Sequence, residues 1–175
     1  PAEKRAELEK NRAKIRAIAT RGDLGANAEL MASLPNLEIV SVFGVGTDSV
    51  DLAYARSHNI KVTNTPDVLT DDVADIAVAL LLATARHVPQ GDQLVRAGTW
   101  PQGGLPLVTR VSGKKVGIVG MGRIGAAVAK RLNAFDCAIS YFARSEKDGS
   151  PFRFEPDLLK LARETGVRLH IGRIS

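Results

Sequence analysis

The glycine-rich stretch at residues 120–125 constrains the fold of this chain more than any other feature. It reads G-x-G-x-x-G, directly follows the apolar run 115–119, and opens the amphipathic run 123–135. In such a strand–turn–helix, the first glycine permits a tight turn, the second lets a pyrophosphate approach the backbone, and the third lets helix and strand pack closely. The N–H groups at the helix start would then face the anion. The pattern predicts a dinucleotide site, with a ligand-free tight turn as the alternative, at Gly120, Met121, Gly122, Arg123, Ile124 and Gly125.

The end of the next predicted strand, 138–142, indicates which dinucleotide is bound. A site for NAD usually carries Asp or Glu about 20 residues past the glycines, where the carboxylate binds the ribose 2′-OH. Here Ala143 takes that place, and Arg144 and Ser145 follow it. A guanidinium grips a phosphate through two hydrogen bonds, and a hydroxyl can donate a further one. These three residues therefore favour NADPH over NADH, with Arg144 as a merely solvated turn residue as the alternative.

Predicted strands alternate with predicted helices along the chain. Short, mostly β-branched runs predict strands at 15–20, 37–43, 61–65, 116–119, 138–142 and 167–171. Helical patterns occur at 2–13, 27–34, 51–58, 69–86, 90–97, 123–135 and 156–164. This order predicts an α/β fold with parallel sheets covered by helices on both faces. The helix at 69–86 is apolar on most of its surface, which predicts burial between domains or between subunits.

Composition and charge argue against several function classes. No apolar run approaches the roughly 20 residues that cross a bilayer, and the charged residues 1–16 do not resemble a secretory signal. The single cysteine, Cys137, fits a reducing compartment, so we expect a cytoplasmic protein with no membrane partner. A net charge of +5 raises the question of nucleic acid. The cations are spread singly and no basic run is interleaved with aromatics, so we expect no nucleic-acid partner.

Several stretches of the chain are informative together: 17–22, 43–51, 62–66 with Val68, 72–75 and 113–147. In this order they resemble the D-isomer-specific 2-hydroxyacid dehydrogenases, in particular the glyoxylate/hydroxypyruvate and hydroxyphenylpyruvate reductases. Their order and spacing are much more specific than the glycines alone. The resemblance implies two incomplete, doubly wound parallel-sheet domains. Residues 1–68 would form a partial, flavodoxin-like substrate domain, and 69–175 a partial Rossmann NAD(P)-binding domain that includes the inter-domain helix 69–86.

The resemblance also implies a reaction and a set of binding residues. The expected reaction is the NADPH-dependent reduction of hydroxypyruvate, glyoxylate or hydroxyphenylpyruvate to the D-2-hydroxy acid. The loop at Val45 and Gly46 would hold the substrate carboxylate, although it could be an ordinary strand-end turn. Val68 and Val73 would border the cofactor, although their residue type alone would suit a core. The helix 69–86 would join two chains in a homodimer.

The family's catalytic Arg, Glu and His are implied to lie downstream of the stretches matched here, so we expect no catalytic residue in this chain. His58, His87 and His170 do not fit the catalytic position. We expect a chain truncated at both ends, with one open edge on the strand 116–119 that would favour dimerisation or poor solubility. The alternative is a non-catalytic dinucleotide-binding fragment or pairing module. Turnover of hydroxypyruvate or glyoxylate would separate the two.

Overall fold

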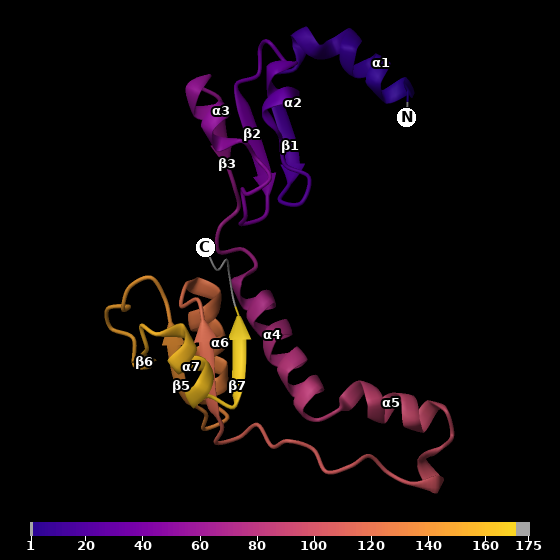
Figure 1. Ribbon diagram of the computed structural model, residues 1–175. Coiled ribbons are helices and arrows are strands. Elements are labelled where there is room, and N and C mark those ends of the chain that lie inside the picture. Colours follow the sequence, from indigo (N-terminus) through magenta and orange to yellow (C-terminus); the bar gives the residue numbers. More distant parts are fainter. Residues whose placement is uncertain (1, 171–175) are drawn as a thin grey trace. The chain divides into compact units, whose positions relative to one another are not determined.

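The computed structural model describes residues 2–170, and the chain divides between Val68 and Leu69 into two compact units (Figure 1). Each unit has its own parallel sheet and its own buried hydrophobic core. This arrangement confirms the predicted α/β class.

The first unit is a three-stranded parallel sheet in the order β1-β2-β3. Its elements are α1 (Ala2–Asn11), η1 (Arg12–Lys14), β1 (Ala17–Arg21), α2 (Ala28–Ala32), β2 (Ile39–Phe43), α3 (Leu52–Ser57) and β3 (Lys61–Thr63). Because both crossovers proceed in the same direction and parallel crossovers are right-handed, α2 and α3 cover the same face. Along β2, Val40 and Val42 are buried while Phe43 is 72% exposed. The sheet therefore buries one face within the described residues.

Side chains at the two helix starts of this unit account for where the helices begin. The Asn27 carboxamide accepts a hydrogen bond from the Leu30 N–H at 2.9 Å, and the Asp51 carboxylate accepts one from the Tyr54 N–H at 2.8 Å. Each bond satisfies a first-turn donor that has no partner within its helix. The two caps thus fix the point at which each loop after β1 and β2 ends.

The second unit is a four-stranded parallel sheet in the order β6-β5-β4-β7. Its elements are α4 (Thr70–Ala85), α5 (Val88–Arg96), η2 (Trp100–Gln102), β4 (Lys115–Val119), α6 (Arg123–Asn133), β5 (Ala138–Phe142), β6 (Arg153–Phe154), α7 (Leu158–Glu164) and β7 (Val167–His170). Helices α6 and α7 lie on opposite faces of the sheet, and α4 packs against α6 (Figure 1). The sheet is therefore doubly wound around the fully buried Val116 and Ile118 of β4.

The expectation of an open edge on the strand 116–119 was wrong. Strand β4 pairs with β5 on one side and with β7 on the other, with Val116 opposite Val167 and Ile118 opposite Leu169. The physical reason is the crossover through α7, which returns the chain to the far side of β4 instead of extending the sheet beyond β6. The partly exposed side chains of β7 fit its place at the end of the sheet. Ile171, at the end of the predicted strand 167–171, lies outside the described residues.

Two short elements were not predicted, β6 and η2, because two or three residues are too few to show a periodic pattern.

Helix α4 begins at its N-cap Leu69, with no capping side chain. The Arg131 side chain of α6 ties the two helices together, because it donates hydrogen bonds to the carboxylates of Asp71 and Asp75. None of the helices in residues 2–170 is long and apolar enough to cross a membrane.

Candidate functional site

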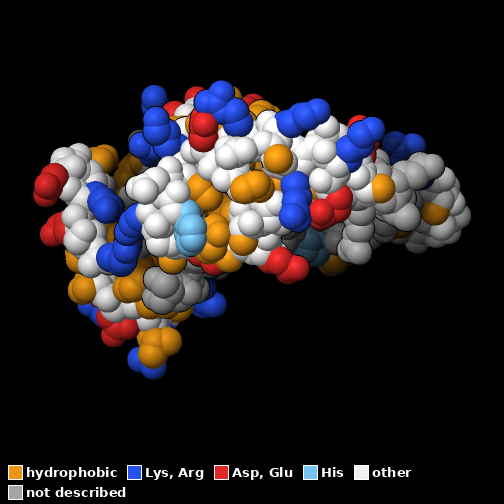
Figure 2. Space-filling model, turned by 90° about the horizontal axis from the view of Figure 1, so that it is seen from above, with side chains coloured by type: hydrophobic (Ala, Val, Ile, Leu, Met, Phe, Trp, Pro, Cys, Tyr) orange, Lys and Arg blue, Asp and Glu red, His pale blue; other side chains and the backbone are white. Residues whose placement is uncertain are grey.

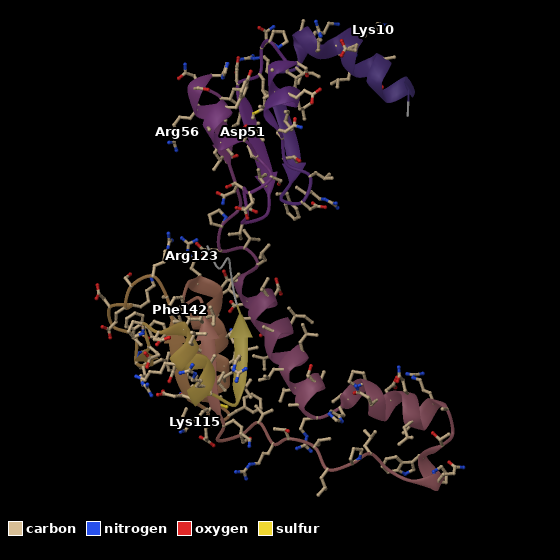
Figure 3. All side chains as sticks on the ribbon, viewed as in Figure 1. Lys10, Asp51, Arg56, Lys115, Arg123 and Phe142 are labelled. Carbon is tan, nitrogen blue, oxygen red and sulfur yellow. The ribbon has the colours of Figure 1, made fainter. Side chains whose placement is uncertain are left out.

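The glycine-rich turn connects β4 to α6 at the carboxyl end of the parallel strands. Gly120 has a positive φ of 103°, and its N–H donates to the carbonyl of Phe142 at 2.9 Å. This bond ties the turn to the end of the neighbouring strand β5. Figure 3 places Arg123 and Phe142 at this end of the unit and Lys115 at the opposite end. In doubly wound sheets the ligand crevice lies at the carboxyl ends, where the strand order reverses, which here is between β4 and β7.

Gly125 and Gly122 are glycines for different reasons. A Cβ at position 125 would lie 2.0 Å from the carbonyl oxygen of Gly120, so helix and turn pack too closely for any side chain. A Cβ at position 122 would meet no atom within 4 Å, and its φ of −84° suits any residue. Neither protein packing nor backbone strain accounts for glycine at 122. The open space before the helix is where an anion would contact the backbone.

The start of α6 is suited to an anion in a second respect. Its N-cap is Gly122, which has no side chain with which to cap the first turn. The first N–H groups of a helix carry a partial positive charge and need acceptors from outside the helix. A dinucleotide pyrophosphate fits this cradle. Met121 is buried beneath the turn and Ile124 packs against the core, so both support the backbone rather than face solvent.

A groove of about 460 Å³ joins this turn to the loop that follows β5. One wall comes from the turn and α6, the other from residues 147–152. Its lining residues are Met121, Gly122, Arg123, Ala126, Lys147, Asp148, Gly149, Ser150, Pro151 and Phe152. The groove therefore joins the glycine turn to the later part of the loop after β5. Residues 143–145, where the sequence predicts cofactor selection, lie at the start of that loop and are not among the lining residues.

Residues 143–145 lead from β5 into that loop. Ala143 is partly buried and packs against the core, whereas Arg144 and Ser145 are exposed. Lys147 lines the groove directly, and sequence reasoning did not single it out. In the sequence, residues 144–147 are typical of a solvated turn, and only the fold shows that Lys147 lines the same groove as Gly122. The sequence signal that could have identified Lys147 is its position three residues after Arg144, as a second cation in the same loop.

Three larger hollows in the described residues lie away from this chemistry. The first, of about 610 Å³, is bordered by Lys115, Arg153 and Glu164 at the amino ends of the strands. The second, of about 560 Å³, lies in the first unit beside Arg16 and Glu38, which form a salt bridge at 2.7 Å. The third, of about 480 Å³, lies along β1 and β2 of the same unit. Size alone would favour any of the three. We give precedence to the smaller groove because it alone adjoins the glycine turn at the carboxyl ends of the strands.

A cluster of charges at β6 and α7 has a structural role. Glu155 is almost completely buried, and its carboxylate lies 2.9 Å from the Lys160 ammonium and 2.8 Å from the Arg153 guanidinium. The hydrogen bond from Lys160 is the largest cause that holds the pKa of Glu155 below its usual value. The Asp157 N–H and Arg153 act in the same direction, while burial opposes them. The cluster therefore links the short strand β6 to α7.

In the first unit, the loop after β2 carries the predicted substrate residues. Asn64 donates from Nδ2 to the Val45 carbonyl at 2.8 Å, and the Gly44 N–H donates to Thr65 Oγ1 at 2.9 Å. From the other side, a Cβ at Gly22 would lie 3.1 Å from the Gly46 carbonyl oxygen, so the end of β1 lies close to this loop. The loop is thus held from both neighbouring strands.

Two backbone donors of this loop, at Val45 and Gly46, differ from that of Gly44. The N–H groups of Val45 and Gly46 donate to no partner among the described residues. Val45 is partly exposed, and Gly46 has no side chain to cover its backbone. Two adjacent free N–H groups at a strand end suit a small carboxylate.

The structure places the remaining candidates without bringing them to a site. Val68 is exposed as the last residue of the first unit, and Val73 is partly buried in the first turn of α4. Their predicted place beside a cofactor remains a prediction. His58 stacks on Tyr54 with ring centroids 3.9 Å apart, and His87 has a left-handed backbone with φ 53° between α4 and α5. The side chain of His170 lies outside the described part of the chain.

Comparison with known proteins adds independent evidence. The profile of the family described as "D-isomer specific 2-hydroxyacid dehydrogenase, catalytic domain" matches residues 2–153. A glyoxylate/hydroxypyruvate reductase A of Arabidopsis thaliana is 48% identical over 165 residues, which are 94% of this chain and 53% of the relative. A hydroxyphenylpyruvate reductase of Plectranthus scutellarioides is 50% identical over 153 residues, which are 87% of this chain and 49% of the relative.

A solved structure also matches the fold. It is an NADPH-dependent glyoxylate/hydroxypyruvate reductase from Sinorhizobium meliloti in complex with NADP and malonate, with a TM-score of 0.87 and 40% identity. The match covers 97% of this chain and 52% of that one. The chain thus spans about half the length of the curated relatives it matches.

Proposed function

The chain belongs to the D-isomer-specific 2-hydroxyacid dehydrogenase family, and from that membership we propose that it carries the adenosine-binding and carboxylate-binding parts of an NADPH-dependent 2-keto-acid reductase. Hydroxypyruvate, glyoxylate and hydroxyphenylpyruvate are the candidate substrates, because they appear in the names of its relatives. The observation that carries the proposal is the groove between the glycine turn and the loop after β5. Its open backbone at Gly122 and the absence of an acid at Ala143 suit a phosphorylated dinucleotide.

The two phosphate groups of the cofactor would bind at two places, the glycine turn and the start of the loop after β5. The first-turn N–H groups of α6 hold the pyrophosphate, because the N-cap residue Gly122 has no side chain with which to cap them. Arg144 and Ser145 bind the 2′-phosphate, the first by paired charge-assisted hydrogen bonds and the second by a hydroxyl bond. Ala143 carries no carboxylate. An Asp or Glu at this position would repel the 2′-phosphate and would instead bind a free ribose hydroxyl.

The loop at Val45 and Gly46 would hold the carboxylate of the keto acid through its two free N–H groups. When bound, the nicotinamide supplies the hydride that reduces the keto group. We assign the general acid to neither His58 nor His87, because His58 stacks on Tyr54 and His87 lies in the turn between two helices. Turnover of hydroxypyruvate or glyoxylate with NADPH distinguishes a reductase from a non-catalytic dinucleotide-binding module.

Helix α4 would pair with a second copy of the chain. Its apolar side chains Ile76 and Leu80 are 56% and 60% exposed, although the opposite face of the helix packs against α6. An apolar stripe on a 16-residue helix is more simply explained by a protein partner than by solvent. We place this dimer in the cytoplasm, where the free Cys137 stays reduced.

The cofactor assignment is tested by titrating the chain with NADPH and, in parallel, with NADH in a calorimeter. The wild type is expected to bind NADPH more tightly. Arg144→Ala is expected to weaken NADPH binding by about tenfold to a hundredfold, since a hydrogen bond to a charged group contributes about 1.5–3 kcal/mol. Arg163→Ala, which removes an exposed arginine from α7, is the matched control and is expected to change neither affinity. Equal affinity for the two dinucleotides would refute the assignment.

A further inference from the structure

Tyr141 is a completely buried residue of β5 whose hydroxyl contacts the backbone of the loop after β5. Its ring packs against Phe154 of β6, with the centroids 5.4 Å apart and the planes tilted by 45°. Its hydroxyl accepts a hydrogen bond from the backbone N–H of Lys147 at 2.8 Å. A phenylalanine would fill the same space, so core packing by itself does not explain the hydroxyl. The feature that requires it is the loop backbone.

The loop that Tyr141 contacts has few other fixed points. At its start, the Phe142 carbonyl accepts the hydrogen bond from Gly120. Within the described residues, Arg144, Ser145 and Glu146 make no hydrogen bond or ion pair of their own. The next attachment is Lys147, whose carbonyl accepts from the Ser150 N–H at 3.1 Å and so begins the turn that lines the groove.

Resting on the NADPH site proposed above, we propose that Tyr141 is a positioning residue for recognition of the 2′-phosphate. Its hydroxyl fixes the far end of the segment that carries Arg144 and Ser145, as the Phe142–Gly120 hydrogen bond fixes the near end. A loop held at both ends loses less conformational entropy when it closes on a phosphate, and this difference appears as affinity. NADH lacks the 2′-phosphate, so its binding depends less on the order of this segment. Tyr141 therefore acts on cofactor selectivity without touching the cofactor.

The test compares Tyr141→Phe with the wild-type chain in two measurements. Titration with NADPH and with NADH is expected to show NADPH binding weakened by about threefold to tenfold, the usual effect of one neutral hydrogen bond, with NADH binding unchanged. Amide hydrogen exchange is expected to show faster exchange at Lys147. Tyr54→Phe is the matched control, because it removes the chain's other tyrosine hydroxyl from the first unit and is expected to change neither measurement.

Two results would overturn the inference: an unchanged ratio of NADPH to NADH affinity, which includes an equal loss for both dinucleotides, or unchanged exchange at Lys147. An equal loss would mean that the hydroxyl supports the site as a whole and does not act on recognition of the 2′-phosphate. If the wild type itself shows no preference for NADPH, the proposed function fails first and the inference fails with it. Selective loss in Tyr141→Phe with an intact wild-type preference supports both.

A second pair of variants covers the case in which Tyr141→Phe does not fold. Glu146→Gly loosens the same segment without altering the core, and Glu146→Ala removes the same carboxylate with less gain in flexibility. The glycine variant is expected to bind NADPH about twofold to fivefold more weakly than the alanine variant, with no difference for NADH. Equal NADPH affinity of the two variants would contradict the positioning role of the loop.

Discussion

An alanine at position 125 tests the close packing of α6 on the glycine turn. The added methyl group would lie 2.0 Å from the carbonyl oxygen of Gly120 and 3.1 Å from its carbon. Alanine favours a helix interior over glycine by about 1 kcal/mol, whereas overpacking costs about 1–3 kcal/mol or more. The clash is with backbone, which cannot rotate away, so the upper end of that range applies. We therefore expect Gly125→Ala to lower the free energy of unfolding of the second unit by about 2 kcal/mol.

Native-state hydrogen exchange measures the loss of unfolding free energy in the second unit, because the amides of Val116 and Ile118 lie at the buried centre of that unit. Gly122→Ala is the matched control, since its methyl group would meet no atom within 4 Å. We expect the control to cost no more than about 1 kcal/mol, the usual difference between glycine and alanine at an N-cap, but to weaken NADPH binding. The packing argument would be refuted if Gly125→Ala were as stable as the wild type. It would also be refuted if Gly122→Ala lost more free energy of unfolding than Gly125→Ala.

Two further predictions concern acid stability and assembly. Because the folded state lowers the pKa of Glu155, chiefly through Lys160, the stabilisation from this carboxylate is full above its ordinary value of 4.5 and is lost as the pH falls through the lowered one. Glu155→Gln should therefore lower the thermal unfolding midpoint at neutral pH, and the midpoint of this variant should fall less than that of the wild type when the solution is made acid. Midpoints of variant and wild type that fall in parallel would contradict this. Leu80→Asp on α4 should shift the sedimentation profile toward monomer, and a profile unchanged from wild type would count against pairing through this helix.

The regular elements could be predicted from the sequence because each has a local cause. β4 is a β-branched run that ends at a glycine turn, and it lies where the pattern predicts it. The pairing of strands depends on the path of the chain, which periodicity does not record. The alternation of Val167 and Leu169 indicated a partly exposed strand, but only the fold shows that this strand covers the edge of β4.

The candidate site could be predicted in part for the same reason. The glycines and the missing acid at Ala143 are signals within a single motif. Lys147 could not be predicted from such a motif, because its place in the groove depends on the hydrogen bond from its N–H to the buried hydroxyl of Tyr141 and on the turn to Ser150. On the face shown in Figure 2, Lys and Arg side chains lie at separate places among acidic and neutral ones. The net charge of +5 does not say where in the fold cations meet, so it did not point to Lys147.

The location of the cofactor site is tested most directly by mapping the backbone amide shifts of the chain as NADPH is added. We expect the largest shifts at Gly122 and Lys147, on the two walls of the groove, and at Arg144, at the start of the loop after β5. NADH at the same concentration is expected to shift Gly122 but to affect Arg144 much less. Shifts confined to the hollows beside Lys115 or Arg16, or no shifts at all, would contradict the assignment of this groove to the cofactor.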